Sequence, residues 1–106
     1  MKQTKEKFTP GPWSVTDERN SSGSPYKSIR RADGKSAYNI AIIGDRMPSP
    51  SQWLPNAQLI SAAPDLYAAL EALLKAVDSG IESDPELWRR GVSLANKALA
   101  KARGES

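Results

Sequence analysis

The chain has 106 residues, of which 39% are hydrophobic and 25% charged, and a formal net charge of +3, a composition typical of one globular domain. It contains neither cysteine nor histidine. Their absence excludes zinc sites built from those residues, thiol nucleophiles and imidazole acid–base catalysis, and the other polar residues follow no recognised catalytic spacing. The composition therefore predicts a protein that is not an enzyme and that carries no metal or cofactor.

Charge and hydropathy limit where the protein acts. No apolar run approaches the roughly 18–20 residues of a membrane span, and the charged N-terminus lacks the apolar region of a signal peptide. Residues 1–54 carry nine Lys/Arg against five Asp/Glu, whereas residues 55–106 carry six against seven. We therefore expect a cytoplasmic protein whose anionic partner, if it has one, contacts the N-terminal half. The alternative is that the extra lysines only keep the protein soluble.

The residue pattern changes near residue 55: before it the pattern is typical of strands and turns, and after it the pattern is typical of helices. We expect a single α+β domain over residues 1–106, with a flexible N-terminal tail at 1–8, a β part at 9–54 and a helical part at 55–104. The β part should form an antiparallel sheet of about three strands, and the helical part a C-terminal antiparallel hairpin.

Two β-prone runs flank Asp33-Gly34, and an Asp-Gly pair in that position is the strongest short-range hairpin signal. A two-residue turn there places Ile29 opposite Tyr38. The predicted core face of the sheet then consists of Ile29, Tyr38, Ile40 and Ile42. After this hairpin, Asp45–Pro55 contains three prolines and is predicted to be a loop, long enough to be functional or mobile.

The helical half shows apolar residues at alternating spacings of 4 and 3. The first stripe consists of Leu59, Ala63, Leu66, Leu70, Leu73 and Val77, and the second of Trp88, Val92, Ala95, Leu99 and Ala102. Pro64 suits the first turn of a helix, so a short helix over 56–62 should break before a longer one. Gly80 should end the longer helix, and Ser83 or Asp84 should cap the next. We expect both helices to pack over the sheet, with Trp88 in the core.

The candidate ligand-binding residues are Arg30, Arg31, Asn39, Arg46, Trp53 and Asn56. An arginine on a sheet can bind phosphate in a bidentate manner, and a loop tryptophan can stack on a nucleobase. Structural alternatives remain open for each. Arg30 and Arg31 point to opposite faces of a regular strand and could simply protect a strand edge. Trp53 could pack with Leu54 or against a second subunit. Asn56 could cap a helix, whose N-terminus can itself bind an anion.

Two segments, TPGPW at residues 9–13 and NAQLISAAPDLYAAL at residues 56–70, resemble the TPGPW and NAxLIxAAPxLLxAL segments of small accessory proteins of tailed phages and prophages. In size, charge asymmetry and strand-then-helix order, the chain is also similar to phage proteins that sequester nucleotide immune signals. The resemblance implies an anti-defence protein in the host bacterial cytoplasm. It would bind a small anionic nucleotide-like signal, of the cyclic nucleotide or cyclic ADP-ribose type, as a homo-oligomer. The alternative is a protein–protein inhibitor or adaptor of a host defence or regulatory protein.

Two further expectations concern partners. Sequence-specific nucleic-acid binding is disfavoured because no predicted helix has a basic face. A homo-oligomer, most simply a dimer, is expected because the apolar helix surface is wider than a two-helix hairpin over a small sheet can use. The two remaining functions differ in where the candidate cations and Trp53 point. Convergence in a pocket between subunits favours a ligand, and dispersion over an open surface favours a protein partner.

Overall fold

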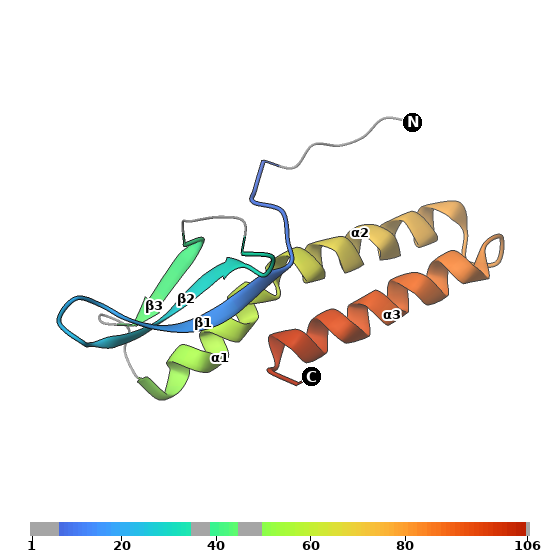
Figure 1. Ribbon diagram of the computed structural model, residues 1–106. Coiled ribbons are helices and arrows are strands. Elements are labelled where there is room, and N and C mark those ends of the chain that lie inside the picture. The colour runs from blue at the N-terminus through green and yellow to red at the C-terminus, as the bar shows by residue number, and fades with distance from the viewer. Residues whose placement is uncertain (1–6, 35–38, 45–49, 106) are drawn as a thin grey trace.

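The computed structural model describes residues 7–34, 39–44 and 50–105. In this part of the chain, three strands precede three helices (Figure 1), which confirms the α+β class and the order of an antiparallel sheet followed by a helical hairpin. The elements are β1 (Trp13–Arg19), β2 (Pro25–Arg31), β3 (Ala41–Gly44), α1 (Pro50–Ser61), α2 (Ala63–Ser79) and α3 (Pro85–Ala102).

The sheet has the strand order β1-β2-β3, and both neighbouring pairs are antiparallel. Ile29 pairs with Ala41, so the predicted pairing of Ile29 with Tyr38 is wrong by three residues. The Asp-Gly pair does form a turn, in which the Gly34 N–H donates to the Arg31 carbonyl at 3.1 Å. That turn is only the start of a longer connection, however, and strand pairing resumes at Ala41.

An odd shift in register exchanges the two faces of β3. Ile43 therefore lies in the core at 2% exposure, whereas Ile42, which the sequence predicts as a core residue, is 60% exposed on the opposite face. Ile40 precedes β3 and packs against the core as expected. Tyr38 lies outside the described residues, so its predicted place on the core face stays a prediction.

The core forms where α1 lies against one face of the sheet (Figure 1). Trp53, Ala57 and Ile60 follow one another at spacings of 4 and 3 and so share one face of α1. Ala57 is buried against Ile29 and Ile43, and the other two side chains pack around this cluster. A single helix thus supplies the layer that covers the sheet.

The helical assignment of Pro50–Pro55 corrects the prediction of a loop as far as Pro55. Pro50 opens α1, where a proline is well tolerated. Pro55 lies inside the helix and cannot donate the backbone hydrogen bond expected at its position. Because Trp53 and Ala57 pack on the sheet only if this segment is helical, tertiary packing outweighs the local penalty.

The helical hairpin extends away from the sheet (Figure 1) and does not pack over it as predicted, because α1 already occupies the inner sheet face. The predicted break before Pro64 is confirmed, since α1 ends at Ser61 and α2 begins at Ala63 with Pro64 in its first turn. Gly80 follows α2 with a φ of +86°, a conformation that favours glycine at a helix end.

Small residues form the seam between α2 and α3. The buried residues of the two helices are Ala69, Ala76, Gly91 and Ala98. A Cβ added at Gly91 would lie 3.3 Å from the Cα of Leu73, so the helix axes approach closely there. Leu70 and Val77, on the predicted core stripe, are 59% and 56% exposed. Trp88 is half-buried and does not lie in the core.

The N-cap of α3 is one of the two residues that the sequence predicts. Asp84 is the N-cap, and its carboxylate accepts a hydrogen bond from the Leu87 N–H at 3.1 Å. We expect Asp84→Ala to lower the free energy of unfolding by about 1 kcal/mol, because that N–H loses its acceptor. Asp84→Asn keeps an acceptor oxygen and should lose much less, as measured by thermal denaturation. Equal losses would show that the charge of Asp84, and not its hydrogen bond, stabilises the helix start.

One side chain ties the base of the hairpin to the sheet. Lys101 of α3 donates through Nζ to the Trp13 carbonyl at 2.8 Å and to the Asp65 carboxylate at 2.7 Å. Trp13 begins β1 and Asp65 lies in the first turn of α2. The Lys101 joint therefore connects three elements, and it is partly shielded because both charged side chains are only about a third exposed.

Candidate functional site

Arg30 and Asn39 lie together on the sheet face that α1 does not cover. Arg30 follows Ile29, which is 0% exposed in the core, so alternation along β2 directs the Arg30 side chain to the opposite face. Its Nε donates to Oδ1 of Asn39 at 2.8 Å, and both residues are half-buried. Two of the six predicted residues thus meet, with the guanidinium oriented by a neighbouring amide.

Arg31 lies on the other face of β2, as the predicted alternation requires. Its Nη2 donates to the Asp33 carboxylate at 2.7 Å, and its side chain is 28% exposed. The two arginines therefore do not form one cationic patch. Each already has a polar partner from the connection that follows β2.

Trp53 is part of the folded core and not an aromatic residue presented by a loop. Its indole packs against the cluster of Ile29, Ile43 and Ala57. The Nε1 atom is buried and has no hydrogen-bond acceptor among the described residues. Internal packing is thus present in the structure, with the sheet core and not only with Leu54, which is 44% exposed. Stacking of Trp53 on a nucleobase and packing against a second subunit stay predictions.

Asn56 lies inside α1, which begins at Pro50, so the expectation that Asn56 stands at a helix N-terminus is wrong. The start of the helix at Pro50 is hard to predict from the sequence, because prolines at 48, 50 and 55 locally favour a loop. Arg46 lies outside the described residues, and its predicted role as a ligand contact stays a prediction.

A hollow of about 630 Å³ opens beside Trp53 at the far end of the β1–β2 hairpin. Its lining consists of Asp17, Glu18, Arg19, Pro25, Tyr26, Lys27 and Trp53. Lys27 forms an ion pair with Asp17 across the two strands. Two carboxylates and two cations therefore face this space, so the lining has no net charge to attract an anion.

The sequence alone does not indicate the residues beside Trp53, because they become neighbours only when α1 docks on the sheet. The signal that could have located them is the spacing of Trp53, Ala57 and Ile60, which fits a helix face. Read together with the β-prone run that starts at Tyr26, it would have placed an aromatic residue against the strands.

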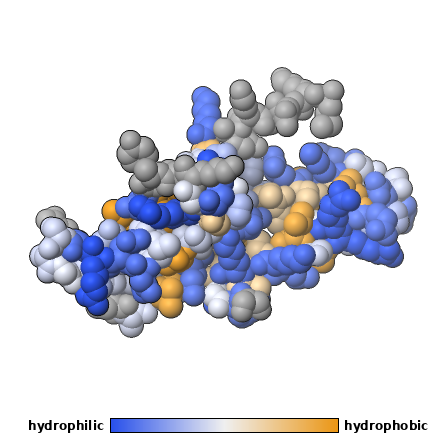
Figure 2. All heavy atoms as spheres, viewed as in Figure 1, coloured by the Kyte–Doolittle hydropathy of each residue, from blue (hydrophilic) through white to orange (hydrophobic). Residues whose placement is uncertain are grey.

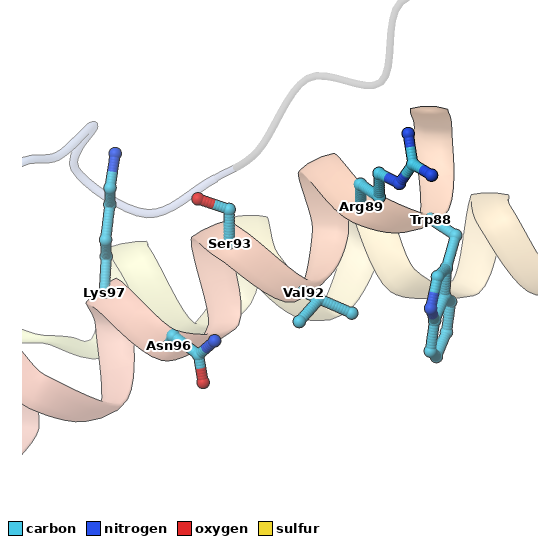
Figure 3. A pocket seen from close by; sticks show the side chains of 6 residues that line it. All are labelled: Trp88, Arg89, Val92, Ser93, Asn96 and Lys97. Carbon is cyan, nitrogen blue, oxygen red and sulfur yellow. The ribbon is translucent and has the colours of Figure 1, made fainter. Parts of the chain in front are cut away.

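A second hollow, of about 480 Å³, follows the outer surface of α3 (Figure 3). All its lining residues come from that one helix, so it has no opposing wall. Trp88 and Val92 point to one side, whereas Arg89, Ser93 and Lys97 point to the other (Figure 3). It is a shallow helix surface with one apolar flank.

The described residues give little support for a metal site, a membrane-spanning helix or a buried titratable site. They contain no group of three metal-binding side chains, and no helix among them is long and apolar enough to cross a membrane. A hydrogen bond from Arg103 lowers the pKa of the Glu105 carboxyl, but both side chains are exposed, so the pair marks no buried site. The candidate residues are therefore dispersed and do not converge on one pocket.

Comparison with known proteins identifies the family of the chain. No curated protein and no solved structure shows a significant similarity to it. Among protein families, that of Salmonella phage P22 protein Y8K6 matches residues 1–106. This agrees with the phage-type resemblance of the two sequence segments. The chain belongs to the family of Salmonella phage P22 protein Y8K6.

Proposed function

We propose that this phage accessory protein acts without catalysis, by binding another protein, as an inhibitor or adaptor of a host defence or regulatory protein. The observation that carries the proposal is the dispersion of the predicted ligand residues. Arg30 and Arg31 lie on opposite faces of β2 and are each paired, and Trp53 packs in the core. A small anionic ligand needs several such groups to converge in one cleft.

The surface proposed for the partner is the outer sheet face, defined by Tyr26, Arg30 and Ile42. Ile42 is 60% exposed and pairs with Ser28, so it stands on the face opposite the core. A shallow hollow of about 270 Å³ adjoins it and is lined by Asn20, Ser24, Pro25, Tyr26 and Ile42. An apolar side chain flanked by an aromatic residue and an arginine is a typical centre for a protein interface.

The experiment compares wild-type protein with Ile42→Asp as bait in a host extract, followed by purification of the captured protein and measurement of its affinity. Burying the new carboxylate in an apolar contact should weaken binding by about tenfold or more. Ser93→Asp, at an exposed position of α3, is the matched control and should bind like the wild type. If Ile42→Asp binds the purified partner unchanged, the outer sheet face is not the binding surface.

A second candidate function, sequestration of a small nucleotide-like signal, rests on the hollow beside Trp53. That space is large enough for a nucleotide and has Arg19 and Lys27 in its wall. A thermal-shift screen with cyclic dinucleotides and cyclic ADP-ribose tests it. A specific ligand at about a hundredfold excess over its Kd would stabilise the protein by roughly 2.7 kcal/mol. Such a shift, lost in Lys27→Ala, would favour sequestration over the protein-binding proposal.

A further inference from the structure

One side of the helical hairpin is apolar and exposed. The side of the hairpin that Figure 2 shows is mixed, with hydrophobic areas among hydrophilic residues. The apolar hairpin face consists of Leu70, Leu74 and Val77 on α2 and of Trp88, Val92 and Leu99 on α3. Leu70, Leu74 and Val77 are 59%, 57% and 56% exposed, and Leu99 is 46% exposed. So many large apolar side chains in water are unusual for a monomer of this size.

The two helices contribute to the same side of the hairpin. On α2, Leu70 and Val77 each follow a buried seam alanine by one position, and on α3, Val92 and Leu99 follow Gly91 and Ala98 by one position. One residue turns a right-handed helix by about 100°. Because the helices are antiparallel, these positions fall on the same side of the pair. Positions one before the seam fall on the other side and include Lys75, Arg90 and Lys97.

We propose that a second copy of this chain covers the apolar hairpin face, related to the first by a two-fold axis parallel to the helices. In this dimer, α2 of each protomer packs on α3 of the other, and the two hairpins form a four-helix arrangement. The inference does not rest on the proposed function, since the outer sheet face belongs to a different part of the molecule.

The charges that flank the apolar hairpin face favour this occupant and this axis. Beside the face, α2 carries Glu71 and Asp78, whereas α3 carries Arg89 and Asn96. The axis parallel to the helices places the acidic edge of α2 next to the edge of α3 that carries Arg89. A two-fold axis perpendicular to the helices would instead place the acidic edges of the two α2 helices next to each other, with carboxylates beside carboxylates.

The close approach of Gly91 to Leu73 shows which residues of α2 and α3 lie at the same height along the hairpin axis. From that contact, Asp78 of the partner subunit would lie level with Glu86, within one helical turn of Arg89. Arg89 now pairs with Glu86 at 2.6 Å, and both side chains are more than 70% exposed. This pair can therefore open or be shared when a partner's carboxylate approaches.

The shape and extent of the hairpin also suit self-association. The radius of gyration is 16.7 Å, against about 13 Å for a compact domain of this length. Two adjacent helices of 17 and 18 residues present a face of roughly 25 by 20 Å. Two such faces would bury on the order of 1,000 Å², near the lower bound for a specific interface. The expected dimer is therefore of moderate affinity and should form at tens of micromolar.

Light scattering during size-exclusion chromatography tests the proposal with the full chain. At tens of micromolar, wild-type protein should elute with twice the chain mass of 11.5 kDa. Leu70→Glu combined with Leu74→Glu should elute at the mass of one chain. Both leucines are more than half exposed in the single chain, so the variant should keep its circular dichroism spectrum. Arg90→Glu, exposed on the other side of the hairpin, is the control and should remain dimeric. A wild-type monomer, or a dimer unaffected by the leucine changes, would overturn the proposal.

A charge exchange tests the axis. Asp78→Arg alone and Arg89→Asp alone should each weaken the dimer by about tenfold, because each sets like charges against one another across the interface. The combined variant should return the Kd to within about threefold of the wild-type value. Failure of the combined variant to recover would rule out the axis parallel to the helices, and with it this dimer.

Discussion

Replacing Ile29 with alanine should lower the free energy of unfolding by about 2–5 kcal/mol. The side chain is 0% exposed, extends from the central strand β2 and clusters with Ile43 of β3 and Ala57 of α1. Alanine would leave a cavity that the paired strands cannot close, because their hydrogen bonds fix the distance between them. A domain of this size has about 5–15 kcal/mol of stability in all, so the loss should be plain in urea denaturation followed by tryptophan fluorescence.

Ile42→Ala is the matched control, one residue from the buried Ile43. Because Ile42 is 60% exposed, the same change of side chain should cost less than about 1 kcal/mol. The comparison also tests the register of the sheet. If Ile42→Ala were as destabilising as Ile29→Ala, then Ile42 would point into the core, and the pairing of Ile29 with Ala41 would have to be abandoned.

Replacing Gly91 with leucine should destabilise the protein by about 2 kcal/mol or more. A Cβ at this position would lie 3.0 Å from Cδ2 and 3.3 Å from Cα of Leu73. The side chain of Leu73 could turn aside, but its backbone could not, so α2 and α3 would have to separate and loosen the seam of small residues. The gain in helix propensity over glycine, about 1 kcal/mol, offsets only part of this cost.

Two variants separate steric crowding from other effects at this seam. Ser93→Leu adds the same side chain to an exposed position of α3 and should change the melting temperature little. Gly91→Ala adds only the Cβ and should fall between the wild type and Gly91→Leu, because the contact with Leu73 must give by a few tenths of an ångström. A fully stable Gly91→Leu would show that the helices do not approach as closely as the structure indicates.

The parts of the fold that the sequence predicts are those with local causes. Asp84 caps α3 because its carboxylate reaches a backbone N–H three residues on. Pro64 marks a helix start, and Gly80 ends α2 with a positive φ. Each depends on the conformation of a few consecutive residues, which is why single positions were enough to locate them.

The errors concern contacts between distant parts of the chain. Nothing local distinguishes a two-residue turn at Gly34 from a longer connection that resumes pairing at Ala41, and that choice sends Ile42 outward. Likewise, the prolines around Trp53 favour a loop until the sheet is present for α1 to pack on. The candidate site depended on both features, so its residues did not meet as expected. Only Arg30 and Asn39, among the candidates that the structure describes, form a pair.

The Lys101 joint has a consequence for the order in which the chain can fold during synthesis. Its lysine is 88 residues away from the Trp13 carbonyl that it contacts. The first strand leaves the ribosome well before α3, so its tie to the hairpin cannot form until Lys101 has also emerged. The sheet and the base of the hairpin are therefore tied together only after all the residues between them have been synthesised, when the last turn of α3 reaches the beginning of the first strand.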